Sequence, residues 1–192
     1  MPHPALVHHT ETQFRKSVVA LSPDAWTAVG YAASTQHMIE GAASVTIIDT
    51  SESTGAARNV LAAFRQHTDK PVGRILYTHS HRDHISGATV FAEGRDIPIF
   101  AAAGFHSDLV GQDGAAIAPT AALNRRTQAQ FGFGLTPEER ISLGCGPGER
   151  PMDGMGAGHL PPTELIAADR AAAERNALLR RQAEAELRLG PA

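Results

Sequence analysis

The sequence predicts an α/β fold of one domain, in which helices cover a sheet. Short apolar runs, such as those within residues 44–49 and 74–78, indicate buried strands. They alternate with stretches of helical spacing, as in the apolar residues Val60, Leu61 and Phe64. Alternating strands and helices are typical of a sheet with helices packed on it. The 192 residues are enough for one core of useful size.

The expected elements follow in order along the chain, separated by Gly and Pro. Strands are expected at 26–29, 36–39, 44–49, 74–78 and 97–101, and helices at 56–67, 85–93 and 119–131. Residues 51–54 offer N-cap candidates for the helix at 56–67. The stretch 132–162 is rich in Gly and Pro and is interpreted as a loop.

The two ends of the chain differ from the middle. Residues 1–20 are interpreted as a leader, in which metal binding by His3, His8 and His9 is a minor alternative. Residues 164–192 are rich in Ala, Arg and Glu and predict a helical tail, with Thr163 as its N-cap. A coiled coil is the second interpretation of the tail, but its leucines do not keep a heptad.

Composition excludes several classes of function. A net charge near −3 gives no electrostatic reason to expect a nucleic acid or an anionic membrane as partner. The single cysteine, Cys145, excludes an internal disulfide framework. The first residues lack the pattern of a signal peptide, and no apolar run has the length of a membrane span. We therefore expect a cytoplasmic protein.

Residues 79–84, with the sequence His-Ser-His-Arg-Asp-His, gather three imidazoles and one carboxylate directly after an expected strand. Because strand side chains alternate between faces, His79 and His81 should point the same way, with Asp83 and His84 further along the loop. Imidazole binds zinc, iron and related ions, and a carboxylate adds compensating charge. The cluster predicts a metal site at a strand end. The alternative is a polar, histidine-rich loop without a metal.

This cluster resembles the H-x-H-x-D-H motif of the metallo-β-lactamase fold. More narrowly, the chain is similar to the alkylsulfatases of that fold, which hydrolyse alkyl sulfate esters such as dodecyl sulfate. The stretches that carry the similarity are 38–53, 63–72, 77–88, 125–132, 143–147 and 160–163. The resemblance implies that residues 21–163 form half, or somewhat more, of an αββα sandwich.

The resemblance also implies a binuclear zinc site. His79 and His81 would bind one ion, and Asp83, to which we assign the catalytic role, would bind the other with His84. A hydroxide or water activated by the two ions would attack a small alkyl sulfate ester. Asp49 matches an aspartate that the fold places beside the metals. It would either orient a ligand histidine or simply cap the following helix, and both interpretations stay open.

The ligand set is incomplete by this comparison. A catalytic zinc ion normally has three protein ligands, and the cluster supplies two for each ion. In the alkylsulfatases, two glutamates and a histidine beyond the segment that matches 160–163 supply the rest, and the resemblance ends near Thr163. His106 and His159 are interpreted as surface or loop histidines rather than ligands. We expect a truncated or frameshifted chain, whose uncovered sheet face or edge favours either aggregation or a partner, in a homodimer or with a complementing chain.

Three hypotheses follow. The first is a zinc-dependent hydrolase of alkyl sulfate esters, active as it stands or completed by another chain. The second is a hydrolase of the same fold that acts on another ester, a lactone or a thioester. The third is a non-catalytic, metal-binding remnant. Whether the chain is an enzyme therefore stays open at this point.

Overall fold

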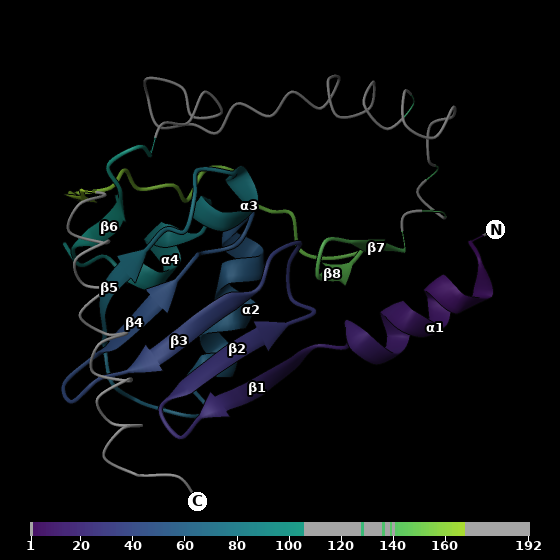
Figure 1. Ribbon diagram of the computed structural model, residues 1–192, viewed down its shortest axis with the longest axis horizontal. Coiled ribbons are helices and arrows are strands. Elements are labelled where there is room, and N and C mark those ends of the chain that lie inside the picture. The colour runs from purple at the N-terminus through teal and green to yellow at the C-terminus, as the bar shows by residue number, and fades with distance from the viewer. Residues whose placement is uncertain (1, 106–127, 129–135, 137–138, 140, 168–192) are drawn as a thin grey trace, which may run out of the picture.

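A seven-stranded mixed sheet forms the centre of the molecule, as predicted for an α/β fold. The computed structural model describes residues 2–105, 128, 136, 139 and 141–167. The sheet has the order β1-β2-β3-β4-β5-β6-β9 (Figure 1). Its strands are β1 Ser17–Ser22, β2 Ala25–Val29, β3 Gln36–Glu40, β4 Val45–Ile48, β5 Val72–Leu76, β6 Ile99–Ala102 and β9 Glu164–Ile166. Neighbours from β1 to β4 are antiparallel, and β4, β5, β6 and β9 are parallel.

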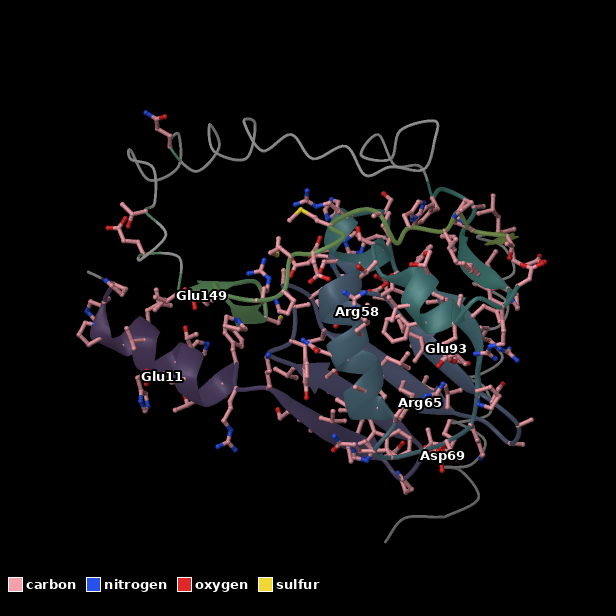
Figure 2. The ribbon with its side chains drawn as sticks, turned by 180° about the vertical axis from the view of Figure 1, so that it is seen from behind. Glu11, Arg58, Arg65, Asp69, Glu93 and Glu149 are labelled. Atoms are coloured by element: carbon pink, nitrogen blue, oxygen red, sulfur yellow. The ribbon has the colours of Figure 1, made fainter. Side chains whose placement is uncertain are left out.

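Helices α2 (Thr54–Phe64) and α4 (Ala88–Ala92) cover the same face of the sheet, as the two opposite views show (Figures 1 and 2). The ends of these helices are joined by an ion pair of 2.8 Å between Arg65 and Glu93, both labelled in Figure 2. Helix α1 (Pro4–Gln13) lies beyond the sheet and buries none of its residues. No helix in the described ranges is both long and apolar enough to cross a membrane.

The core lies between the sheet and these two helices. Along β4, Val45 and Ile47 are buried while their neighbours are only partly so, which is the alternation of a strand with one covered face. They pack in one apolar cluster with Phe64 of α2 and Phe91 of α4. On the other face, side chains of β1 and β3 remain exposed in this structure, namely Val19, Leu21 and Ile39. One sheet with helices on one face is the half-sandwich that the sequence predicts.

The structure corrects the prediction at both ends of the chain. Residues 17–20 were expected in the leader, but they belong to β1, which pairs with β2. Residues 164–166 were expected in the helical tail, but they form β9 beside β6. In both cases pairing with a strand already in the sheet overrides local helix or coil preference. The limits 1–20, 21–163 and 164–192 as domain boundaries stay a prediction, and residues 168–192 lie outside the described ones.

The other predicted elements differ less. The helix expected at 85–93 is two short helices, α3 (Arg82–Ile85) and α4, which Gly87 separates. A Cβ at Gly87 would lie 2.0 Å from the carbonyl oxygen of Thr50, so only glycine allows this close approach. The loop expected at 132–162 contains the small hairpin β7 (Ser142–Leu143) and β8 (Gly146–Pro147). Apart from residue 128, the helix expected at 119–131 lies outside the described residues.

Candidate metal centre

The predicted cluster lies at the carboxyl ends of the parallel strands β4 and β5. Asp49 directly follows β4, and its amide donates to the carbonyl oxygen of Leu76 at the end of β5 (2.9 Å). His79 follows three residues after Leu76, and the remaining cluster residues continue into α3. His79 and His81 are exposed, whereas Asp83 and His84 are half-buried. The site is thus open to solvent on one side and packed on the other.

The Asp49 carboxylate is buried and accepts three hydrogen bonds. One oxygen accepts from the amide of Thr78 (2.9 Å), and the other accepts from the Thr78 hydroxyl and from Nδ1 of His84 (both 2.7 Å). Helix α2 is capped instead by Ser53, whose hydroxyl accepts from the amide of Ala56 (3.1 Å). The interpretation of Asp49 as a helix cap is therefore wrong, and its carboxylate holds the His84 ring.

The cluster forms two pairs of donor atoms. Nε2 of His79 lies 3.1 Å from Nδ1 of His81, and Nε2 of His84 lies 3.4 Å from an oxygen of Asp83. The atoms of each pair contact one another directly, and their separation is close to the roughly 3.3 Å between two ligands of one tetrahedral zinc ion bound at about 2.05 Å. The chemistry of both pairs, imidazole with imidazole and imidazole with carboxylate, also suits zinc.

A third donor is missing from each pair in the described part of the chain. Within residues 2–105 and 141–167, no group of three or more His, Cys, Asp or Glu side chains is arranged to hold a metal ion. The rings of His79 and His84 are close, with centroids 4.0 Å apart, but they belong to different pairs. Among the described residues, the cluster therefore offers two pairs of donor groups, and the structure places no third donor with either pair.

The two pairs have opposite electrostatic environments. Burial and the neighbouring imidazoles of His84 and His81 lower the pKa of His79. Burial also acts to lower the pKa of His84, but hydrogen bonds to Asp49 and Asp83 outweigh it and raise that pKa to about 9. For Asp83, burial acts to raise the pKa, and the hydrogen bond with His84 outweighs it and lowers the pKa. Asp83 and His84, the inner pair, thus have the character of an ion pair, whereas in the outer pair, His79 and His81, the surroundings favour the neutral form of His79.

Thr50 also holds the main chain of the inner pair, Asp83 and His84. The carbonyl oxygen of His84 accepts from the amide of Thr50 (2.6 Å) and from its hydroxyl (3.1 Å). The chain reaches this position through Asp49 and Ser51, whose φ angles of 60° and 70° lie in the left-handed region. Residues other than glycine are uncommon there, and such strain persists only where the surrounding contacts impose it.

The two further histidines considered in the sequence have different outcomes. His159 stacks on Tyr77 and its Nδ1 lies 3.4 Å from the carbonyl oxygen of Ile85, so it packs behind α3. It belongs to none of the donor groups described above. His106 lies outside the described residues.

Several polar residues around the site had no signal in the sequence. Thr78 orients Asp49, and Ser34 donates to the carbonyl oxygen of Asp83. Glu52 and Arg150 form a bidentate ion pair whose side chains are only 4% and 3% exposed. Their partners are distant in sequence, and Ser, Thr, Glu and Arg in loops are ordinary surface residues in most proteins. Of these residues, only Thr78 is adjacent to the motif in the sequence, because it directly precedes His79.

The comparison with known families agrees with this geometry. The sequence profile of the metallo-beta-lactamase superfamily matches residues 30–155. The chain belongs to this superfamily.

Particular relatives narrow the likeness. The chain is 33% identical over 134 residues to the linear primary-alkylsulfatase of a Pseudomonas species (strain ATCC 19151), covering 67% of this chain and 25% of that protein. It is 30% identical over 158 residues to the alkyl/aryl-sulfatase BDS1 of Saccharomyces cerevisiae, a match that covers 79% of this chain and 24% of that protein. The stereoselective inverting sec-alkylsulfatase Pisa1 from Pseudomonas has a similar structure, with a TM-score of 0.52, 27% identity and coverage of 67% and 21%. The chain spans about a quarter of the length of these curated relatives.

Proposed function

We propose that this chain carries the first part of a zinc site that hydrolyses alkyl sulfate esters. In this proposal His79 and His81 bind one zinc ion, and Asp83 and His84 bind a second. The observation that carries the proposal is the pair of donor sets, each with an atom separation near that of two zinc ligands, at the carboxyl ends of β4 and β5. The substrate class comes from the printed activities of the alkylsulfatase relatives.

Bound zinc would supply Lewis acidity and lower the pKa of water at the site. The protein groups have separate tasks. His79 and His81 are exposed, on the side from which a substrate can approach, and their facing nitrogens, Nε2 of His79 and Nδ1 of His81, would hold the ion. Asp49 accepts the Nδ1 proton of His84 and leaves Nε2 directed at Asp83. A carboxylate behind a ligand histidine fixes its tautomer and strengthens it as a donor. Thr78 in turn fixes the Asp49 carboxylate with two hydrogen bonds.

Each zinc ion in this proposal needs donors beyond the described residues. Catalytic zinc takes three protein ligands and keeps one open position, whereas each pair here offers two. A second copy of the chain or a complementing chain would supply them. That partner and a cytoplasmic location both stay predictions from the sequence.

The test is to strip the purified chain of metal, add back zinc, and measure metal per chain together with sulfate release from dodecyl sulfate. We expect bound zinc and sulfate release, with both lost in His81→Ala and both kept in His8→Ala, a control that removes a histidine from α1. Zinc binding without sulfate release, but with cleavage of an ester, lactone or thioester, would support the second hypothesis. Neither bound metal nor turnover would support a non-catalytic chain.

A further inference from the structure

The loop between β2 and β3 contacts the cluster through one side chain. Ser34, which is 6% exposed, donates its hydroxyl proton to the carbonyl oxygen of Asp83, 49 residues further along the chain. A serine hydroxyl has a single proton, so this bond uses it completely. Asp83 is one of the four residues that we assign to the metal. The Ser34 hydroxyl fixes its main chain, although Ser34 lies in a distant loop between two other strands.

Gln36 fixes the direction of the Ser34 hydroxyl. Its side-chain nitrogen donates to the Ser34 oxygen (2.8 Å) and to the Ser34 carbonyl oxygen (3.0 Å), which uses both amide protons. Gln36 is fully buried, and in this structure its own side-chain oxygen has no partner. A buried amide with an unsatisfied oxygen is costly. The Gln36 nitrogen, by contrast, is fully used, with both of its protons bound to Ser34.

The Ser34 loop is itself clamped from two distant segments. The Ala33 amide donates to the buried Glu52 carboxylate (3.1 Å), and the Ala33 carbonyl oxygen accepts from the amide of Cys145 (2.7 Å). The β7–β8 hairpin, which contains Cys145, can approach the Ser34 loop closely because two of its residues are glycines. A Cβ at Gly144 or Gly146 would lie 2.0 or 2.2 Å from backbone oxygens of this loop. The loop therefore has little freedom to move away from Asp83.

We propose that Ser34 is a positioning residue that, together with Gln36, sets the position of Asp83 in the metal site. The carbonyl oxygens of Asp83 and His84 are then held from two different loops, by Ser34 and by Thr50 respectively. Two fixed carbonyls set the turn of α3, and with it the separation of the Asp83 and His84 side chains. This inference rests on the proposed function for its consequence in metal binding, but the positioning itself concerns the metal-free chain.

Hydrogen exchange of the metal-stripped chain tests the positioning directly. In Ser34→Ala we expect the amides of residues 82–86 to exchange several-fold faster, because the turn loses one of its two anchors. Ser34→Thr keeps a hydroxyl and should restore slow exchange. Ser22→Ala removes an exposed serine hydroxyl that donates to Asp24, and it serves as the matched control. Unchanged exchange at 82–86 in Ser34→Ala, or a rise of equal size across the whole sheet, overturns the proposal.

Zinc titration of the same variants gives the second readout. Ser34→Ala should bind zinc about tenfold more weakly than the wild type, as for other residues that orient metal ligands, and Ser34→Thr should recover most of this loss. Gln36→Met, which removes the donors at similar volume, should shift exchange and affinity the same way by less. If the wild type binds no zinc, the proposed function fails, and the exchange result still decides the role of Ser34.

Discussion

The two donor pairs of the site differ in how the protein supports them. His79 and His81 are exposed, and their nitrogens contact each other and Thr78. Asp83 and His84 are half-buried, and contacts from Asp49, Thr50 and Ser34 hold them in place. The difference indicates that contacts within the fold hold the inner pair, whereas fewer contacts from the described residues hold the outer pair. Within one six-residue motif, Asp83 and His84 thus contribute to the stability of the fold, whereas His79 and His81 are exposed to solvent.

The largest expected effect on stability concerns the Glu52–Arg150 ion pair. Glu52 holds the loop that contains Ser34, and Ser34 in turn contacts Asp83 of the inner pair. Arg150→Met leaves the Glu52 carboxylate buried without its partner, and this should lower the free energy of unfolding by about 3–5 kcal/mol. Urea unfolding followed by circular dichroism measures the change. The double variant Glu52→Leu with Arg150→Met should recover a large part of the loss, since it removes both charges. Equal losses in the single and double variants would contradict this account.

The next effect concerns Asp49, the direct support of His84. Asp49→Asn keeps a residue that tolerates the left-handed backbone but replaces one acceptor oxygen with a donor. The neutral amide cannot accept charge-assisted hydrogen bonds from Thr78 and His84, so we expect the metal-free chain to lose about 2 kcal/mol of unfolding free energy. The matched control, Asp24→Asn, changes an exposed carboxylate in the turn after β1 and should shift stability by under about 0.5 kcal/mol. Similar values for the two variants would remove Asp49 from the support of the inner pair.

A smaller effect should appear in the pH dependence of stability through His159, which packs behind α3. Burial lowers the pKa of His159, and its hydrogen bond to Ile85 offsets this only in part. The unfolded chain therefore takes up a proton near pH 6.5 that the folded chain resists, and stability falls as the pH drops below 6.5. His159→Gln should flatten this loss between pH 7 and 5 in urea unfolding of the metal-free protein. A curve as steep as that of the wild type would show that other groups cause the loss.

The smallest effect on stability is expected in the outer pair. His81→Ala should change the unfolding free energy of the metal-free chain by under about 0.5 kcal/mol, because the side chain is exposed. His84→Ala should cost about 1–2 kcal/mol, since it removes one of the three hydrogen bonds of the buried Asp49 carboxylate. Unfolding curves recorded with a chelator compare the two directly. If His81→Ala destabilised the chain as much as His84→Ala, the two halves would not differ as described.

The place of the cluster in the fold could be predicted from the sequence because the information is local, whereas its role as a metal site stays a prediction. The four cluster residues, their position after a strand, and Asp49 at the end of the preceding strand all lie in continuous short patterns. The supports could not be predicted, because the contacts of Ser34 with Asp83 and of Glu52 with Arg150 join residues 49 and 98 positions apart. The fold shows the same limit. The central strands were predicted to within two residues at most ends, but β1 and β9 were missed because each exists only through its neighbour in the sheet.

By itself, the sequence determined the α/β class, the half-sandwich and the place of the cluster, because apolar periodicity and a compact motif act over a few residues. Only the tertiary structure decided which side chains support which ligand pair. It brought Asp49 to His84 and Ser34 to Asp83, and it buried Glu52 against Arg150. These contacts depend on strand order and on close approaches at glycine, where one backbone packs on another. The motif places the four candidate ligands next to one another in the sequence. The packing around it fixes Asp83 and His84 and leaves His79 and His81 exposed.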